Sequence, residues 1–386
     1  MAGTGLVDVV KKYRRLYGEA VRVERSRLLD AFCGLTGYHR KYATALLNAV
    51  AREPALPRRR RGASYSPKAL RVIEAIWAAA GYPWSVRLVA MLPAWLPWAC
   101  QEVLGATEAV KAEVLSISAR QLDRRLAPKK RQLKRRLYGH TKPGTLLKHQ
   151  IPIKTEHWDV ATAGHLEIDL VSHCGPSASG EFIYSLNVTD IHTGWCETRA
   201  ILGKSEGNVV TALEDIRRAL PFALASIDSD NGSEFINHHL KRYCEKHTIG
   251  FTRSRPYKKN DNAHIEQKNW THVRRVLGWD RYDTREQLAA LNALYTGPLR
   301  LMMNLFQPCV KLLSKERVGS KVRRKYSAPR TPLQRLTATP AGAYPAALLL
   351  LENTQAKQDP FALSRDIDHR LKALAQPAPK TKKCAA

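Results

Sequence analysis

The sequence is short of acidic residues and of long apolar runs. It contains 34 Asp and Glu against 63 Lys and Arg, a formal net charge of +29. No apolar run approaches the roughly 18 residues that span a bilayer, and the N-terminus lacks a signal-peptide core. We therefore expect a cytoplasmic protein rather than a membrane or secreted one. The excess of positive charge indicates a polyanionic partner, either nucleic acid or an anionic membrane surface.

Disulfide and zinc scaffolds are missing as well. The seven cysteines are odd in number and scattered, and no C-x-x-C pair occurs. The His and Cys side chains within residues 238–247 match no usual zinc spacing, so we interpret them as side chains that decorate a helix. This cysteine usage fits a reducing cytosol.

What remains is a globular chain with uneven charge. Its 386 residues, 44% of them hydrophobic, can build two or three domains. Residues 1–150 carry a net charge of +19, residues 151–300 a net charge of −1, and residues 301–386 a net charge of +11. This distribution is expected of a protein whose two basic flanks neutralise phosphates and whose middle section needs its carboxylates.

Changes of pattern divide the chain into six regions. These are a helix-turn-helix DNA-binding region at 1–51, a basic linker at 52–67, a second helical DNA-binding region with a connector at 68–157, an α/β core at 158–284, a helical and basic region at 285–340, and a weakly ordered tail at 341–386.

The first region indicates two helices around a glycine-containing break at Cys33–Gly37. Arg40 and Lys41 turn outward from the second helix, whose predicted apolar face consists of Tyr42, Leu46 and Ala49. Helix, short turn and basic helix is typical of a helix-turn-helix, in which the second helix reads DNA. An ordinary helical hairpin with a solvated basic face is the alternative.

Two further basic segments are candidate DNA contacts. An arginine run followed by glycine can enter a narrow minor groove, although a soluble charged linker explains it equally well. A serine cap at Ser118 opens a basic helix that suggests a second DNA-reading element. The candidate residues are Arg58, Arg59, Arg60 and Arg61 in the linker and Arg124 and Arg125 in the helix.

From residue 158 strands and helices alternate. Three strand patterns are followed by a helix, a short strand, a helix, another short strand and a helix that starts near residue 262. The strands are predicted at 166–171, 182–188, 194–201, 223–228 and 249–252. This is the order of the ribonuclease-H-like fold, with a mixed five-stranded sheet and flanking helices.

Three acids stand out in this core. Asp169 lies within the first strand, Asp230 ends the fourth, and Glu266 lies in the first turns of the last helix. Glu266 heads a stripe with Trp270, Val273 and Leu277 at helical spacing, so we expect its carboxylate on the face that packs against the sheet. Glu167 and Asp228 share faces with the strand acids and are the nearest rivals.

Inward-facing carboxylates call for a cation. Burial of an unpaired carboxylate costs free energy, and several carboxylates at one site repel one another. A divalent metal ion offsets both costs because its positive charge neutralises the carboxylates. Two Mg²⁺ ions can bind the attacking and leaving oxygens on opposite sides of one phosphate. We therefore expect two Mg²⁺ ions per site, with Mn²⁺ able to substitute.

These motifs resemble the DDE transposase/retroviral integrase superfamily, and more loosely the bacterial insertion-sequence transposases. The interval between Asp230 and Glu266 is 35 residues, the spacing of the D,D-35-E group, and Ser229–Phe235 resembles the second-aspartate motif. The resemblance implies that Asp169, Asp230 and Glu266 form the catalytic and metal-binding triad of an integrase-like core at 158–284.

The same resemblance implies a mobile active-site loop. Tyr257 and Asn262 would belong to it, and Lys258, Lys259 and Lys268 would contact DNA. The sequence departs from the family in two ways. No His/His/Cys/Cys zinc module precedes the core, and Val273 stands where integrases often have a basic residue, a role that Lys268, Arg274 and Arg275 can fill.

The predicted function is that of a DNA transposase/integrase. It would bind the terminal repeats of its element, cleave the DNA ends and transfer the 3′-OH strand into target DNA. Its partner would be double-stranded DNA, on which we expect a homo-oligomer to assemble, and its location the cytoplasm at the nucleoid, with no membrane. The alternatives are a metal-dependent nuclease or resolvase on the same fold, and an inactive DNA-binding regulator.

Overall fold

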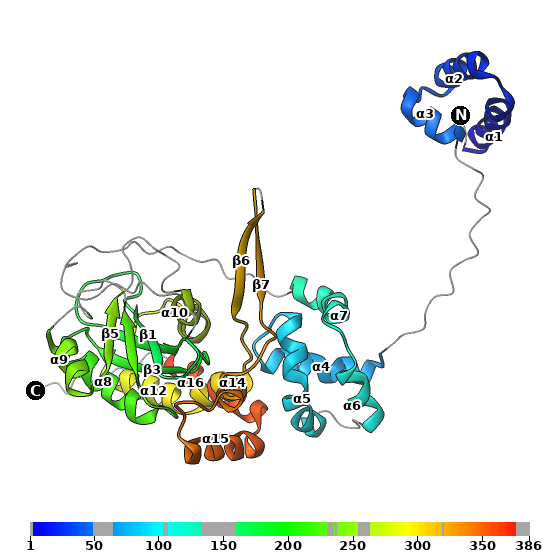
Figure 1. The fold of residues 1–386 in the computed structure, drawn as a ribbon. Helices are drawn as coiled ribbons and strands as arrows, with labels where there is room; N and C mark the ends of the chain where they lie inside the picture. Colours follow the sequence, from blue (N-terminus) through cyan, green and yellow to red (C-terminus); the bar gives the residue numbers. More distant parts are fainter. Residues whose placement is uncertain are drawn as a thin grey trace, which may run out of the picture. The chain divides into compact units, whose positions relative to one another are not determined.

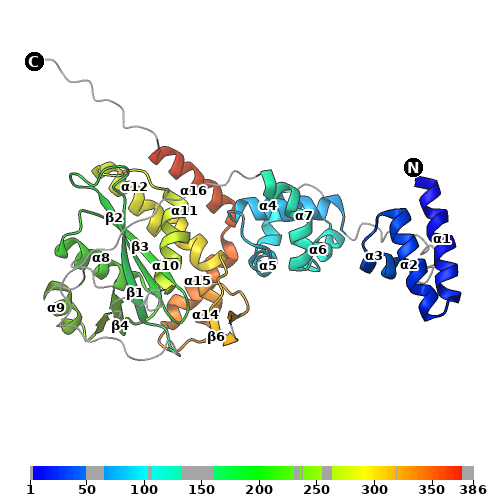
Figure 2. The same cartoon turned by 90° about the horizontal axis from the view of Figure 1, so that it is seen from above.

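The computed structural model describes residues 3–48, 65–102, 107–132, 160–229, 235, 238–253, 263–318 and 320–375 (Figures 1 and 2). The chain forms two compact units, Met1–Ser64 and Tyr65–Ala386. The predicted linker arginines 58–61 and the connector within 133–159 lie outside the described residues.

The first unit is a bundle of three helices, α1 (Gly3–Glu19), α2 (Arg22–Thr36) and α3 (Arg40–Asn48). Gly37 ends α2 with φ of 72°, a left-handed conformation that favours glycine, and its N–H donates to the carbonyl of Cys33. Phe32 is fully buried at the centre of the unit. The predicted break therefore lies at the end of Cys33–Gly37, and α2 continues through Thr36.

The apolar face predicted for α3 is partly wrong. Ala43 and Leu47 are its buried residues, whereas Tyr42 is 55% exposed and stacks edge-on against Tyr38. Leu46 is partly buried, and Ala49 lies outside the described residues. The small Ala43 is fully buried, and a pattern of large apolar residues does not detect it.

The second unit begins with four helices, α4 (Pro67–Ala79), α5 (Ser85–Glu102), α6 (Glu108–Leu115) and α7 (Ala119–Gln132). Ser118 caps α7, as the sequence predicts. Ser66, at the end of the predicted linker, caps α4. Of the tryptophans in this region, Trp77 and Trp95 are buried, whereas Trp84 is exposed. These helices share one apolar core with the rest of the unit.

A five-stranded sheet with order β3-β2-β1-β4-β5 follows. Its elements are β1 (His165–Ser172), β2 (Ile183–Asp190), β3 (Cys196–Leu202), α8 (Glu206–Ala219), β4 (Ser226–Ser229), α9 (His238–Lys246) and β5 (Gly250–Arg253). The first three strands are antiparallel and β4 and β5 run parallel to β1. This confirms the predicted mixed sheet and its element order. Apolar side chains at helical spacing along α8 are all buried: Val209, Leu213, Ile216 and Leu220.

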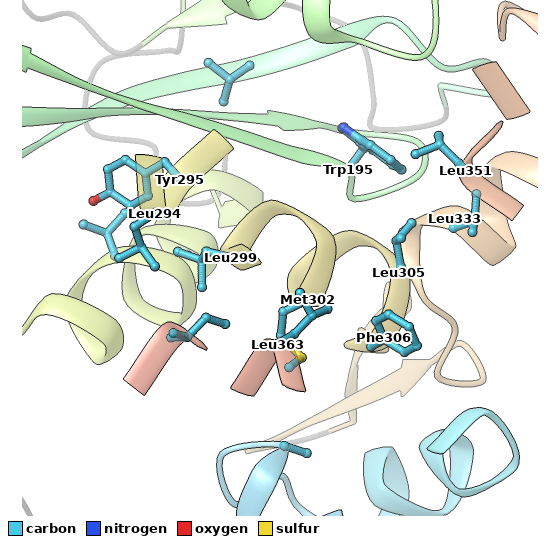
Figure 3. Packing of buried hydrophobic residues seen from close by; sticks show 14 of the residues in the cluster. Trp195, Leu294, Tyr295, Leu299, Met302, Leu305, Phe306, Leu333, Leu351 and Leu363 are labelled. Atoms are coloured by element: carbon cyan, nitrogen blue, oxygen red, sulfur yellow. The ribbon is translucent and has the colours of Figure 1, made fainter. Parts of the chain in front are cut away.

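A long helix crosses the sheet beyond β5. It consists of α10 (Ala263–Lys268), a π-helical turn η1 (Asn269–Arg274) and α11 (Arg275–Leu277). Next come α12 (Arg285–Thr296), α13 (Pro298–Leu301) and a second π-helical turn η2 (Met302–Phe306). Figure 3 shows Leu294, Leu299 and Met302 from these helices in the core, on the same side of the sheet as Trp195.

Helices also close the C-terminal part, where the sequence predicts a weakly ordered tail. They are α14 (Pro332–Ala338), α15 (Pro345–Lys357) and α16 (Pro360–Leu374). Leu351, Phe361 and Leu363 are buried, and Phe361 packs edge-on against Trp95 of α5. The prediction of a weakly ordered tail is therefore wrong for residues 345–374. A small number of buried apolar side chains is enough to pack each helix against the core. Residues 376–386 lie outside the described residues.

The region predicted as helical and basic at 285–340 begins with the helices α12, α13 and η2. Its basic part, between η2 and α14, forms a hairpin, β6 (Leu312–Val318) and β7 (Lys321–Tyr326). Figure 1 shows it as a narrow two-stranded ribbon that rises from the body of the unit. No helix among the described residues is long and apolar enough to cross a membrane.

Candidate active site

Asp169 occupies a half-exposed position on the central strand β1. Its neighbours in β1 face the core: Leu166 and Ile168 are buried, as the alternation predicts. The parallel register pairs Ile168 of β1 with Ser229 of β4. The residues that follow these two in the sequence are Asp169 and Asp230, of which Asp230 lies outside the described residues.

The Asp169 carboxylate is held on both oxygens. Oδ1 accepts the backbone N–H of Leu170 at 2.8 Å, and Oδ2 accepts the side-chain amide of Asn269 at 2.6 Å. Asn269 belongs to η1, three residues after Glu266. The helix that carries Glu266 therefore binds the strand acid directly.

Asn269 is itself oriented by a hydrogen-bond relay across the sheet. The Asn187 amide donates to Asn269 Oδ1 at 2.9 Å, and the Thr198 hydroxyl donates to Asn187 Oδ1 at 3.0 Å. Asn187 is directly opposite Asp169 in the β1–β2 register, and Thr198 is directly opposite Asn187 in the β2–β3 register. Both are buried, so the relay is screened from water.

The rival acid Glu167 has a structural contact instead. It is completely buried, and its Oε2 accepts the backbone N–H of Ile265 at 2.9 Å. A carboxylate at the first turn of a helix also complements the helix dipole. Glu167 thus fastens the start of α10 to β1, one residue before Glu266.

Glu266 does not head the buried stripe that helical spacing predicts. Its side chain is exposed, whereas Ile265, Val273 and Leu277 are buried. The π-helical turn η1 has i→i+5 hydrogen bonds and changes the phase of the helix after Lys268. Helical spacing of 3.6 residues per turn, counted back from Val273 and Leu277, therefore predicts Glu266 on the buried face, where the structure has Ile265.

The second rival, Asp228 of β4, is also buried. Its Oδ1 accepts the hydroxyl of Thr252 on β5 at 2.8 Å. Buried in the sheet, it is less open to a substrate than the half-exposed Asp169.

Lys268 is buried, which removes it from the predicted DNA contacts. Its ammonium donates to the carbonyl of Gly194 at 3.1 Å. It lines a cavity of about 400 Å³ between α4, the η1 helix, η2 and α16, together with Arg87 and Cys309. Burial raises the pKa of the Cys309 thiol, but the positive charges of Lys268, Arg335 and Arg87 outweigh it and hold the pKa below its ordinary value.

The remaining predicted DNA contacts divide into two groups. Arg124 and Arg125 are exposed on α7, and Arg40 and Lys41 are exposed on α3, where Arg40 pairs with Asp30. The predicted positions outside the described residues are Arg58, Arg59, Arg60, Arg61, Tyr257, Lys258, Lys259 and Asn262.

The donor chemistry at Asp169 suits a hard cation. The Asp169 side chain is only partly buried, both of its carboxylate oxygens accept hydrogen bonds, and Mg²⁺ prefers such oxygen ligands. The part of the chain that the structure describes contains no group of three His, Cys, Asp or Glu side chains arranged around a metal. Asp230, one of the three acids of the predicted triad, lies outside the described residues.

Comparison with known proteins identifies the core. Residues 159–259 match the family described as "Integrase core domain". The match includes Asp169 and Asp230 and ends before Glu266. Together with the observed sheet and its flanking helices, it defines an integrase core of the DDE transposase/retroviral integrase superfamily, to which the chain belongs.

A full-length relative extends the kinship beyond the core. The protein y4rM of Sinorhizobium fredii (strain NBRC 101917 / NGR234), whose full name is "Uncharacterized protein y4rM", is 35% identical over 338 residues, which cover 86% of this chain and 94% of the relative. The chain is thus a member of the family of y4rM.

Solved structures of viral integrases are similar to the core more remotely. The catalytic core of BIV integrase is 16% identical, covers 46% of this chain and 95% of its own, and has a TM-score of 0.30. The HTLV-2 integrase catalytic core, in complex with magnesium, is 12% identical, covers 38% of this chain and 91% of its own, and has a TM-score of 0.29.

Proposed function

We propose that the protein is a DNA transposase. It binds the terminal repeats of its element, cleaves DNA to expose a 3′-hydroxyl, and joins that hydroxyl to target DNA as a homo-oligomer in the cytoplasm at the nucleoid. The observation that carries the proposal is the hydrogen bond from Asn269 to Asp169, since it brings the strand acid and the helix of Glu266 together on an integrase core.

Asp169, Asp230 and Glu266 would hold two Mg²⁺ ions, with Mn²⁺ as a substitute. When bound, the ions would supply positive charge that stabilises the attacking oxygen and the oxygen that leaves phosphorus. The residues of the chain do the positioning: Asn269 fixes the rotation of the Asp169 carboxylate, and Glu167 fixes the start of the helix that presents Glu266.

The chemistry balances without a covalent protein intermediate. In cleavage, a water oxygen bonds to phosphorus, the bridging 3′ oxygen leaves and takes up a proton, and a 5′-phosphate remains. In joining, the freed 3′-hydroxyl attacks a target phosphodiester, whose own 3′ oxygen leaves as a hydroxyl.

The candidate DNA-binding residues form four groups along the sequence. Arg40 and Lys41 on α3 fit a helix-turn-helix reader of the terminal repeats, and Arg124 and Arg125 on α7 fit a second contact. The arginines at 58–61 and the lysines Lys258 and Lys259 complete the proposal from sequence alone.

The test uses isosteric amides in the full-length protein. Asp169→Asn, Asp230→Asn and Glu266→Gln should each abolish cleavage and joining of an end whose transferred strand is labelled at its 5′ terminus, with binding to that end unchanged. Asp228→Asn is the matched control and should retain activity, because Asp228 is buried against Thr252.

The same assay separates the alternatives. Cleavage without joining would indicate a nuclease or resolvase. Binding that is indifferent to chelation, with no cleavage by the wild-type protein, would indicate a regulator and would overturn the proposal.

A further inference from the structure

The hairpin β6–β7 is a basic ribbon that the proposed chemistry does not use. From Lys311 to Arg330 the chain carries eight basic residues and a single acidic one, Glu316. Arg323, Arg324 and Lys325 are consecutive in β7 and all three are exposed. Alternation in a strand sends Arg324 to one face of the ribbon and Arg323 and Lys325 to the other.

The ribbon is anchored at its root. Cys309 and Arg330 exchange backbone hydrogen bonds of 2.9 and 3.1 Å, and the N–H of Ser327 donates to the carbonyl of Lys311 at 2.8 Å. The Lys311 ammonium donates to the carbonyl of His192, which ties the root to the turn between β2 and β3. The ribbon is therefore held by the catalytic unit at one end.

Beyond the root, each strand packs mainly against the other. Figure 1 shows β6 and β7 rising together away from the helices and the sheet. Leu313 is 61% exposed and Tyr326 is 50% exposed, so the described positions of the ribbon have no covering layer. At about 3.4 Å per residue, the seven residues of β6 extend roughly 24 Å.

A free two-stranded ribbon leaves its outer backbone edges open, and natural proteins protect such edges with charge or with a partner. Pairing with a second copy of the ribbon would bring two strongly positive segments together. A polyanion is favoured instead. The major groove of duplex DNA, about 12 Å wide, admits a two-stranded ribbon, and phosphates border it on both sides.

We propose that the β6–β7 ribbon is a DNA-binding arm that enters the major groove of duplex DNA. Residues on both faces of β7 contact phosphates on the two sides of the groove. Glu316, the one acid of the ribbon, is opposite Arg323 in the register. The choice of duplex DNA as the partner rests on the proposed function. The arm is anchored on the catalytic unit, so it positions DNA relative to the sheet.

The experiment compares two triple variants of the full-length protein with equal loss of charge. Arg323→Gln/Arg324→Gln/Lys325→Gln removes the exposed cations of β7. Arg242→Gln/Lys246→Gln/Lys372→Gln removes three exposed cations from α9 and α16 and serves as the control. Circular dichroism and thermal unfolding confirm that both variants fold.

The ribbon variant should bind a 30-base-pair duplex about tenfold more weakly. The slope of log affinity against log salt should flatten by roughly 0.9 for every phosphate that the variant no longer neutralises. Guanine N7 atoms that the wild-type protein protects from methylation should become reactive with the ribbon variant. The control should differ little from wild type in both measurements.

Equal affinity and equal slope for the two triple variants would overturn the proposal. So would loss of self-association in the ribbon variant, measured by sedimentation without DNA, if DNA affinity stays the same. The proposed function fails separately: if the wild-type protein joins no DNA ends yet its affinity depends on the ribbon, the arm stands and the transposase assignment does not.

Discussion

Asn269 donates a hydrogen bond of 2.6 Å from its amide to the Asp169 carboxylate, which links the helix of one predicted acid to the strand of another. Asn269→Ala should lower the turnover of DNA cleavage about 10- to 100-fold, because the carboxylate can then rotate. Affinity for DNA should stay within about twofold. Gln267→Ala, an exposed amide on the same helix, is the control.

Two measurements distinguish a role of Asn269 in positioning Asp169 from a purely structural role of Asn269 in the fold. The Mg²⁺ concentration for half-maximal cleavage should rise in Asn269→Ala, and Asn269→Asp should be worse than Ala because it sets a second carboxylate against Asp169. If Asn269→Asp has the same cleavage rate and the same Mg²⁺ requirement as the wild-type protein, Asn269 does not position Asp169.

Acid should destabilise the catalytic unit through His173. This side chain is fully buried and shares a hydrogen bond of 2.7 Å with Ser185, which in turn bonds Tyr295. Burial lowers its pKa from 6.5 to about 3, with a smaller contribution from Arg274. Between these two values the unfolded chain binds the proton and the folded chain does not, so stability is full above pH 6.5 and falls toward pH 3.

The measurable quantity is the slope of unfolding free energy against pH in denaturant titrations. His173 contributes up to one proton, about 1.4 kcal/mol per pH unit. His173→Gln should reduce that slope, whereas substitution of the exposed His369 by Asn should leave it unchanged. An unaltered slope in His173→Gln would contradict the assignment.

Glu197 of β3 is the buried acid of an ion cluster with Arg199 and Arg300. Its carboxylate accepts from Trp195 Nε1 at 2.9 Å and Arg300 Nε at 2.7 Å, and lies 3.3 Å from Arg199 Nη1. Glu197→Gln should cost about 3–5 kcal/mol of stability, because the partly buried Arg300 loses its carboxylate partner and the buried Arg199 keeps only the exposed Asp215. Chemical denaturation measures this, with the exposed Glu352→Gln as a control that should change little.

Cys309 should be alkylated at lower pH than an ordinary thiol. Burial raises its pKa, yet Lys268, Arg335 and Arg87 together lower it below the ordinary value, and Arg335 Nη1 lies 3.3 Å from the sulfur. Burial raises the pKa of Cys100, which is a reference within the same chain. The pH profile of iodoacetamide labelling, followed by mass spectrometry, should have a lower midpoint for Cys309 than for Cys100.

Arg335→Gln should move the Cys309 midpoint upward and leave that of Cys100 in place. A midpoint for Cys309 at or above that of Cys100 in the wild-type protein would show that the three cations do not stabilise its thiolate.

Much of the core is visible in the sequence because apolar alternation and helical spacing are local. The strand around Asp169 and the stripe of α8 follow directly from them. Asn187 and Asn269 carry no such signal, since their importance arises from strand register and from a helix that meets β1 across 100 residues of sequence.

The C-terminal helices escape prediction for a different reason. Asp359 caps α16 and Pro360 opens it, a start signal that the sequence displays, yet the segment is weakly patterned overall. The β6–β7 ribbon escapes prediction because its strands are charged rather than alternating, and charge alone does not distinguish a strand from a solvated helix.

The two ends of the segment 254–262 are fixed by the sheet. Arg253 of β5 is paired with Ser229 of β4, and Ile265 is hydrogen-bonded to Glu167 in β1. Doubling the length of a connection between fixed ends costs only about 0.6 kcal/mol. Glu266 should therefore stay in place when the connection between Arg253 and Ile265 is lengthened. For the proposed transposase this means, in evolutionary terms, that preference for a DNA sequence can drift while the reaction chemistry is conserved.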